Sequence, residues 1–385
     1  MDWLNALILF CLIAGNTTIW VAYVNRTHSL PLSCGILHRL RRLHDIMIIV
    51  VPLLLIVLLG LTGPKLLLGG SWSDVSTIWW VAICLCGFGF LGLLVAISRH
   101  WFQPPPTQLV SISSKTIDVA HELGHLPVKE GKYERLARLS MNHQFTVELN
   151  EKTFQLAALP NELDGLTILH ISDWHFMGTI DKEFFEYVAE LLSANSVDLV
   201  CFSGDLIDSM DCVEWIPDTL GKLSGKYGNY FILGNHDWYQ QPEDIRNALH
   251  NIGWIDVSSR TLNISLNEIT LQLGGDETPW MGSQPEFDSD ADFRLLLCHT
   301  PDNFKDAQRA GVHLMLAGHN HGGQVQLPII GPVYSPSKYG TRYASGIFWS
   351  EPTLMHVSRG LSGRHPFRFR CLPEVTRITL RAEQP

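Results

Sequence analysis

Hydrophobic residues follow two patterns along this chain of 385 residues. In the first hundred residues they form three long runs, at 4–23, 46–61 and 78–97, and none of these runs contains a charged residue. From about residue 145 onward the hydrophobic runs are short and are separated by amphipathic stretches. The long runs predict membrane-spanning helices, because about 20 apolar residues are needed to cross a bilayer. The short runs predict strands that alternate with helices.

The second long run is the weakest of the three, because it is the shortest and contains Pro52. A cleavable signal peptide is not expected, since no positively charged segment precedes the first run and two more runs follow it. The arginines between runs one and two, at positions 26, 39, 41 and 42, outnumber the single Lys65 between runs two and three. The positive-inside rule therefore predicts a multi-pass cell-membrane protein. The domain that follows the last run, from about residue 145 and expected below to be catalytic, would then be cytoplasmic. Arg41-Arg42 ahead of an apolar run leaves a twin-arginine export signal open as an alternative.

The rest of the chain is predicted to fold as an α/β domain. Apolar runs at 166–171, 199–203, 230–233, 293–297 and 312–317 are typical of strands, and 183–194 has helical spacing. In such folds the functional groups lie at the carboxyl ends of the strands. We therefore expect a membrane anchor at 1–101 with about three transmembrane helices, a linker at 102–144 that begins with a stiff triple proline, and a catalytic domain at 145–385.

Five short polar motifs stand at the ends of these strand-like runs. They are Asp173-Trp174-His175, Gly204-Asp205-Leu206-Ile207-Asp208, Gly234-Asn235-His236-Asp237, Cys298-His299 and Gly318-His319-Asn320-His321-Gly322-Gly323-Gln324. They supply carboxylate, amide and imidazole groups, which are suitable ligands for divalent transition metals. Phosphoester hydrolysis uses such ions in pairs, because two metals activate a water and neutralise phosphoryl oxygens together.

The set and order of these motifs resembles the calcineurin-like metallophosphoesterase superfamily over roughly residues 145–383. The last motif, followed by Pro336-Ser337-Lys338-Tyr339-Gly340, is similar to a bacterial branch whose members are often attached to membranes. The resemblance implies a layered α-β-β-α sandwich in which two mixed sheets are flanked by helices. It implies that one ion is bound by Asp173, His175, Asp205 and His321, and the other by Asp205, Asn235, His299 and His319. It leaves His236 to stabilise the phosphate and to protonate the leaving oxygen.

The expected substrate is a phosphorylated small molecule or a lipid-linked compound with a phosphoester or pyrophosphate bond, because a membrane anchor suits a substrate at the bilayer surface. The mixed nitrogen and oxygen ligands suit Mn, Fe, Zn, Co or Ni. The second motif lacks the Arg-Gly that follows Asp208 in the phosphoprotein phosphatases of the superfamily, which disfavours protein substrates. Asp208 and Asp237 are candidates for orienting the ligands. Candidate contacts to a second phosphate or headgroup are Lys338, Arg342 and Arg359.

Two other functions remain open on the sequence. One is a catalytically silent protein that keeps the phosphoesterase fold for protein binding, although such proteins typically lose ligands that are all present here. The other is a zinc protease, since His121-Glu122-Leu123-Gly124-His125 matches the H-E-x-x-H motif. Gly124 weakens a helix at that point and no third ligand is evident, which favours solvated linker residues.

Composition narrows the choice of partners. The net charge is −10, of which residues 1–101 carry +3 and the remainder carries −13. A domain this acidic is not expected to bind nucleic acid, and no obligate protein partner is evident. The eight cysteines are scattered without a Cys-x-x-Cys pair, so we expect buried reduced thiols. His170, His313 and His356 lie in apolar runs and are expected to be structural.

Overall fold

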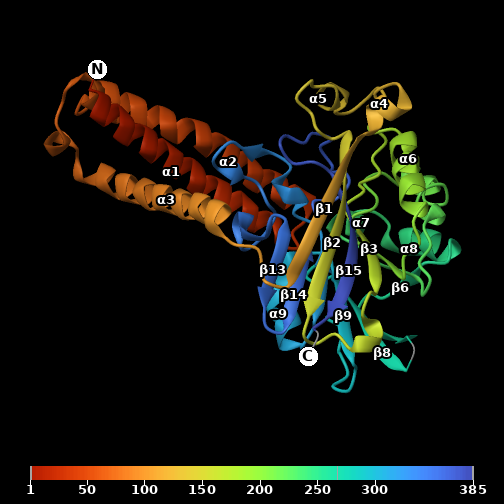
Figure 1. Ribbon diagram of the computed structural model, residues 1–385. Coiled ribbons are helices and arrows are strands. Elements are labelled where there is room, and N and C mark those ends of the chain that lie inside the picture. The colour runs from red at the N-terminus through yellow and green to blue at the C-terminus, as the bar shows by residue number, and fades with distance from the viewer. Residues whose placement is uncertain (1, 267, 384–385) are drawn as a thin grey trace. The chain divides into compact units, whose positions relative to one another are not determined.

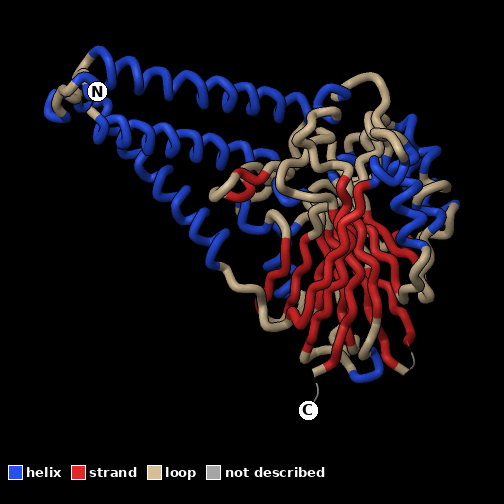
Figure 2. Tube along the Cα trace, turned by 45° about the horizontal axis from the view of Figure 1, so that its top comes forward, coloured by secondary structure: helices blue, strands red, loops and turns tan. Residues whose placement is uncertain are grey.

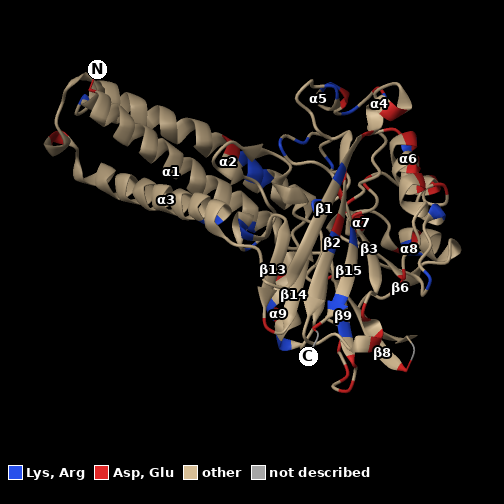
Figure 3. Ribbon diagram, in the orientation of Figure 1, with Lys and Arg blue, Asp and Glu red and all other residues tan. Residues whose placement is uncertain are grey.

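The computed structural model describes residues 2–266 and 268–383. The chain divides into two compact units, one formed by Met1–Gln103 with Pro328–Arg342 and the other by Pro104–Leu327 with Tyr343–Pro385. The first unit contains three long helices, α1 (Trp3–His28), α2 (Cys34–Leu54) and α3 (Thr77–Phe102) (Figure 1). Uncharged residues cover most of the length of these helices, and lysine and arginine occur near their ends (Figure 3).

All three helices are long and apolar enough to cross a membrane, by their length and composition. Helix α2 continues as a π-helix at Leu55–Thr62, so the second candidate span has 29 residues. The run that is short in the sequence therefore belongs to a longer helix, and the π-helical turns follow Pro52, which cannot donate a backbone hydrogen bond. Arg39, Arg41 and Arg42 lie on α2 itself, whereas the sequence pattern places them in a loop.

Close packing of small residues joins α1 to α3. A Cβ atom on Gly15 would lie 1.8 Å from the carbonyl oxygen of Cys86, and one on Gly89 would lie 2.2 Å from the carbonyl oxygen of Gly15. Glycine at both positions lets the two backbones approach each other, as is common between membrane helices.

The segment Pro328–Arg342, which includes β12 (Gly331–Pro332), packs with the helices of the first unit. The buried side-chain amide of Asn25 donates to the carbonyl oxygen of Val333 at 3.1 Å and accepts from the backbone N–H of Ser335 at 3.0 Å. The Tyr334 hydroxyl lies 3.2 Å from Nε2 of His44. This insertion interrupts the catalytic domain that the sequence predicts as continuous over 145–385. The buried side chain of Asn25 forms hydrogen bonds with two backbone groups of the insertion, which helps to hold it against the helices.

The second unit contains two mixed sheets. The seven-stranded sheet has the order β1-β2-β15-β3-β4-β5-β6, with bounds Leu109–Asp118, Thr146–Leu156, Glu374–Ala382, Thr167–Ile171, Leu199–Ser203, Asn229–Ile232 and Ile255–Asp256. The six-stranded sheet has the order β13-β14-β10-β9-β8-β7, with bounds Gly346–Ser350, Thr353–Val357, Leu314–Ala317, Phe293–Cys298, Ile269–Asp276 and Thr261–Leu266. The short strand β11 spans Gln326–Leu327. The helices are α4 (Val119–Leu123), α5 (Glu134–Ala137), α6 (Lys182–Ser193), α7 (Asn235–Trp238), α8 (Pro242–Asn251) and α9 (Phe304–Arg309).

Alternate residues of the central strands enter different apolar layers. In β3, Ile168 joins the core between the two sheets, and Leu169 joins the core under α6 and α8. Strands buried on both faces are apolar at nearly every position, which explains their short continuous runs in the sequence. Figure 2 shows the strands of this unit running side by side, with helices along their flank and loops gathered at one end. Two mixed sheets flanked by helices confirm the predicted fold class.

The predicted linker at 102–144 is largely wrong. Residues 109–118 form the edge strand β1, which pairs antiparallel with β2 along its length. Most side chains of β1 are exposed on both faces, so the strand lacks the apolar alternation by which strands are recognised. Backbone pairing with β2, a contact that sequence periodicity does not report, decides its conformation.

Candidate metal centre

The polar motifs lie at the carboxyl ends of five strands drawn from both sheets. Asp173 follows β3, Asp205 follows β4, Asn235 follows β5, His299 follows β9 and His319 follows β10. Within each sheet these strands are parallel, so their carboxyl ends share one edge and bring the side chains together.

Unusual backbone conformations carry these side chains. Five of the predicted ligands have φ between 50° and 69°, in the left-handed region: Asp173, His175, Asp205, His319 and His321. Such a conformation costs about 1–3 kcal/mol for a residue with a side chain and persists only where the surroundings enforce it. Strain of this kind concentrates at functional sites, and no feature of the sequence signals it here.

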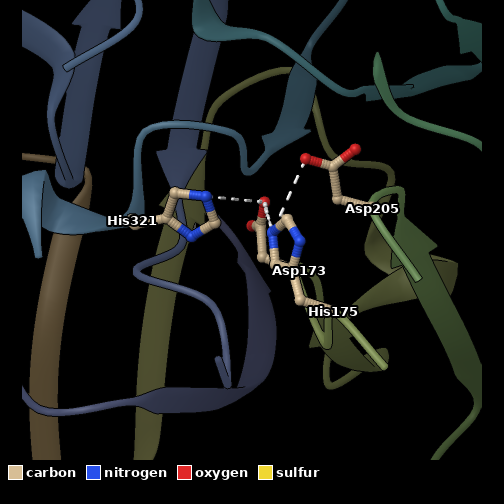
Figure 4. Close-up of side chains that lie close together, drawn as sticks. All are labelled: Asp173, His175, Asp205 and His321. Carbon is tan, nitrogen blue, oxygen red and sulfur yellow. Dashed lines mark ion pairs between the residues drawn. The ribbon is translucent and has the colours of Figure 1, made fainter. Parts of the chain in front are cut away.

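One group of donor atoms is formed by Asp173, His175, Asp205 and His321 (Figure 4). The Nε2 atoms of His175 and His321 each lie 3.9 Å from Oδ1 of Asp173. Nε2 of His175 also lies 3.6 Å from Oδ2 of Asp205. Two carboxylates and two imidazoles therefore face one small volume.

A second group is formed by Asp205, His299 and His319. Nε2 of His299 lies 3.3 Å from Oδ2 of Asp205, 3.1 Å from Oδ1 of Asn235 and 3.2 Å from Nδ1 of His319. The amide oxygen of Asn235 thus joins the same group. Trp280, which the motifs do not include, packs its ring against the imidazoles of His299 and His319, at centroid distances of 5.6 and 4.9 Å.

The donor atoms fit divalent metal ions. Oδ2 of Asp205 and Nε2 of His175 are buried without a hydrogen-bond partner. Leaving such atoms unpaired in the interior is costly, and a bound cation would satisfy both of them. A mixture of carboxylate, amide and imidazole donors suits divalent transition metals.

Asp208 orients two histidines at once. Its Oδ2 accepts from Nδ1 of His175 at 3.0 Å, and its Oδ1 accepts from Nδ1 of His236 at 2.5 Å. Burial alone would raise the pKa of Asp208, but His236 and His175 outweigh it and hold the pKa well below its usual range. With Nδ1 protonated and engaged, His175 presents the lone pair of Nε2 to the first group, as outer carboxylates commonly arrange.

His236 lies beside the first group without belonging to it. Its ring centroid is 4.6 Å from that of His175, and its side chain remains 18% exposed. Burial would lower the pKa of His236, but Asp208 and Asp205 outweigh it and raise the pKa to about 9. Nδ1 is committed to Asp208, so Nε2 is the ring atom available for chemistry.

Asp237 holds the loop that carries Asp205. Its buried carboxylate accepts from the backbone N–H groups of Asp205, Leu206, Ile207 and Gly234 at 2.8–3.2 Å. We expect Asp237→Asn to turn an amide N–H₂ toward these donors, where each unsatisfied donor costs about 1–3 kcal/mol. Metal affinity should fall about 10- to 100-fold although Asp237 faces neither group, as measured by calorimetric titration with Mn²⁺.

Asp244→Asn is the matched control for this change, because Asp244 is an exposed carboxylate on α8. It should leave metal affinity unchanged. Wild-type affinity in Asp237→Asn would show that the loop keeps its conformation without this carboxylate.

Two glycines fit against the carboxylates. A Cβ atom on Gly234 would lie 2.2 Å from Oδ1 of Asp205, and one on Gly318 would lie 2.3 Å from Oδ2 of Asp173. Each glycine belongs to one of the predicted motifs, so its place in the motif has a steric reason. Gly322 has a φ of 63°, and a Cβ atom there would meet Sγ of Cys371.

The three candidate contacts to substrate, Lys338, Arg342 and Arg359, lie in two different units of the structure. Arg359 forms ion pairs with Glu374 and Glu148, so its guanidinium is engaged inside the fold. Lys338 and Arg342 belong to the unit that contains the long helices. Contact with substrate stays a prediction for Lys338, Arg342 and Arg359, and the ion pairs of Arg359 also give it a structural role.

The H-E-x-x-H segment does not form a zinc-protease site. Helix α4 ends at Leu123, and Gly124 has a φ of 75°, so His121 and His125 are not one helical turn apart. Nε2 of His125 contacts Oε1 of Glu183 at 2.5 Å, and His121 is largely exposed. Glycine at this position ends the helix, which overrides the match in sequence.

Comparison with known proteins agrees with this geometry. Residues 166–323 match the family model for calcineurin-like phosphoesterase. The uncharacterized metallophosphoesterase YkuE of Bacillus subtilis is 31% identical over 249 residues, covering 61% of this chain and 86% of the relative. The phosphodiesterase YaeI of Escherichia coli is 27% identical, with 59% of this chain and 86% of the relative covered. A transmembrane protein with metallophosphoesterase domain from Danio rerio is 28% identical, with 58% of this chain and 55% of the relative covered.

The similarity to YkuE extends over most of that relative's length, and the family model covers the motifs from Asp173 to Gly323. The three apolar helices and the transmembrane relative indicate association with a membrane. The chain therefore belongs to the calcineurin-like metallophosphoesterases, metal-binding hydrolases that act on phosphoric ester bonds.

Proposed function

We propose that this protein is a membrane-anchored enzyme that hydrolyses a phosphoester or pyrophosphate bond with two divalent metal ions. The observation that carries the proposal is the position of one carboxylate oxygen. Oδ2 of Asp205 lies 3.6 Å from Nε2 of His175 and 3.3 Å from Nε2 of His299, so it faces both groups of donors. A carboxylate shared in this way is what a pair of adjacent ions requires.

The donors divide between two ions. Asp173, His175, Asp205 and His321 would hold one ion, and Asp205, Asn235, His299 and His319 would hold the other. When bound, such a pair supplies an activated water at neutral pH and neutralises charge on the phosphoryl oxygens. Mn, Fe, Zn, Co and Ni all suit this donor set.

His236 is the proposed proton donor to the leaving oxygen. Asp208 holds its Nδ1, which directs Nε2 away from Asp208 and leaves the ring outside both ligand sets. The backbone N–H of His236 donates to Oδ1 of Asp205 at 2.8 Å, which fixes the residue beside the shared carboxylate. A positioned imidazole can then protonate the leaving group and bind a phosphoryl oxygen.

The proposed substrate is a small phosphorylated molecule or a lipid-linked compound at the bilayer surface. The three apolar helices support a substrate of this kind, because an enzyme held at the membrane meets amphipathic substrates there. The relative named a phosphodiesterase supports a phosphodiester as the bond that is hydrolysed.

The deciding experiment uses the full chain, purified in detergent, with Mn²⁺ added. Phosphomonoesters, phosphodiesters, cyclic nucleotides and lipid pyrophosphates are assayed in parallel. We expect metal-dependent turnover that EDTA abolishes and Mn²⁺ restores, with higher kcat/KM for diesters or pyrophosphates in mixed micelles. Two ions bound without turnover of any substrate would favour the catalytically silent alternative.

We also propose that the protein crosses the membrane several times, with its catalytic domain in the cytoplasm. Positive charge supports this orientation. The stretch between the first and second apolar runs contains four arginines, at positions 26, 39, 41 and 42, whereas the stretch between the second and third contains only Lys65. A reporter fused after Pro385 should therefore fluoresce if it is a cytoplasmic fluorescent protein and stay inactive if it is alkaline phosphatase. The reverse pair of results would favour export and overturn the orientation.

A further inference from the structure

A chain of buried polar side chains connects the two sheets of the second unit. His170 lies on β3 of the seven-stranded sheet and His356 on β14 of the six-stranded sheet, and both are fully buried. Lys152 on β2 and Glu374 at the start of β15 are also buried. Titratable groups are rarely buried to this degree unless they are paired, so each of these side chains must have a hydrogen-bond partner of the right kind.

The direction of each hydrogen bond follows from Lys152. An ammonium group only donates, and Nζ of Lys152 lies 2.9 Å from Nε2 of His356, so that nitrogen must accept. A His356 that accepts at Nε2 is neutral and carries its proton on Nδ1. Nδ1 of His356 lies 2.8 Å from Nδ1 of His170 and must donate to it.

The tautomer of the second imidazole follows in the same way. His170 accepts at Nδ1, so its proton is on Nε2, which lies 3.0 Å from Oγ of Ser203 and donates to it. The two neighbouring histidines therefore hold opposite tautomers. Oε1 of Glu374 also lies 3.4 Å from Nε2 of His356, but the ammonium group of Lys152 lies closer, at 2.9 Å, and selects this arrangement of protons.

Charges at one end of the chain keep this arrangement in place. Oε1 of Glu374 accepts from Lys152 at 2.9 Å, and its Oε2 accepts from Nε of Arg359 at 2.6 Å. Burial would raise the pKa of Glu374, but Lys152 and Arg359 outweigh it and hold the pKa well below its usual range. Burial and the charge of Lys152 lower the pKa of His356 to about 4, so the imidazole stays neutral.

The other end of the chain reaches the candidate metal centre. Ser203 is the last residue of β4, and its carbonyl oxygen lies 2.8 Å from Nδ1 of His299. A His299 that donates from Nδ1 presents the lone pair of Nε2 to Oδ2 of Asp205 and to the second group of donors. Outer hydrogen bonds of this kind fix the tautomer and ring orientation of metal-binding histidines.

We propose that Lys152, His356, His170 and Ser203 form a positioning relay that holds His299 as a ligand of the second metal ion. The proposal rests on the two-metal function proposed above. The ligands of that ion follow strands of both sheets. The hydrogen bond between His170 and His356 links the same two sheets. The relay fixes the spacing of the sheets and the side chain of the residue whose carbonyl receives Nδ1–H of His299.

The first test reads the protons directly. The full chain is labelled with ¹⁵N-histidine in detergent micelles, and the imidazole nitrogens are assigned by substituting single histidines. We expect His356 as the neutral Nδ1–H tautomer and His170 as the neutral Nε2–H tautomer. Finding either histidine cationic at neutral pH, or with its tautomer reversed, would overturn the relay.

The second test measures Mn²⁺ binding to Ser203→Ala, in which Nε2 of His170 loses its acceptor. One of the two ions should bind about 10- to 100-fold more weakly, the range typical for the loss of an outer hydrogen bond. Ser203→Thr keeps the hydroxyl and should restore much of the affinity, whereas a merely structural role would make the larger side chain worse.

His313→Gln is the matched control. His313 precedes β10 at the end away from His319, and its Nδ1 accepts from the backbone N–H of Arg294 at 3.1 Å. It should change thermal stability without changing either Mn²⁺ affinity. Suppose that Ser203→Ala binds both Mn²⁺ ions with wild-type affinity, while replacing Asp205 removes metal. That pair of results would refute the relay and leave the two-metal function standing. Failure of the wild-type chain to bind two Mn²⁺ ions would refute the two-metal function itself.

Discussion

Asp205→Asn is expected to abolish metal-dependent hydrolysis and to reduce bound metal by more than one equivalent. The substitution keeps an oxygen that can accept from the N–H of His236, which Oδ1 of Asp205 does at 2.8 Å. It replaces Oδ2 by an amide nitrogen that faces both groups of donors and cannot bind a cation. Metal ions contribute several kcal/mol to the stabilisation of the transition state, so kcat should fall by at least about 10³-fold.

Asp198→Asn is the matched control, because Asp198 stands just before β4 and Asp205 shortly after it. Oδ2 of Asp198 accepts from the N–H and hydroxyl of Thr167, which an amide oxygen can also do. Metal content by atomic spectroscopy and turnover should both stay near wild type in this control. Two ions and normal turnover in Asp205→Asn would show that its carboxylate is not shared.

His236→Ala is expected to keep both metal ions and the fold while lowering kcat about 10²- to 10⁴-fold. General acids and bases contribute in this range, which corresponds to roughly 3–5 kcal/mol of barrier. The loss should be largest for alkyl phosphoesters, whose leaving oxygen needs a proton. It should shrink for nitrophenyl esters, whose leaving oxygen is stable as an anion.

His250→Ala serves as the control for a histidine on the surface, since His250 is exposed in the last turn of α8. It should change neither metal content nor the ratio of rates on the two kinds of ester. Equal losses on both esters in His236→Ala would assign the residue to phosphate binding rather than proton transfer. Loss of an ion would make His236 a ligand, as its proximity to His175 and Asp208 would then allow.

The sequence alone determines the core strands and the residue types at their ends. The run at 199–203 coincides with β4, and the runs that end before Asp173, Asn235, His299 and His319 match their strands to within two residues. These signals are local, because a strand buried on both faces is apolar at nearly every position and is followed by a polar loop. The order of the motifs also determines the family.

Local patterns cannot report which distant segments pair. β15, near the end of the chain, inserts between β2 and β3, and β1 forms an edge strand although its side chains are exposed. The helical unit binds Pro328–Arg342 through Asn25, which no periodicity in either segment indicates. Backbone groups, which every residue carries, form at least one side of each of these contacts, so the residue types do not indicate which segments pair.

The tertiary structure also decides what each site residue does. Asp205, Asp208 and Asp237 look alike in the sequence, yet one faces both groups of donors, one holds two imidazoles and one binds a loop through four backbone N–H groups. His170 and His356 are 186 residues apart and look structural in isolation, but they meet between the sheets with their protons fixed by Lys152. Side-chain chemistry is written in the sequence, whereas the neighbours that select one use of it exist only after the chain has packed.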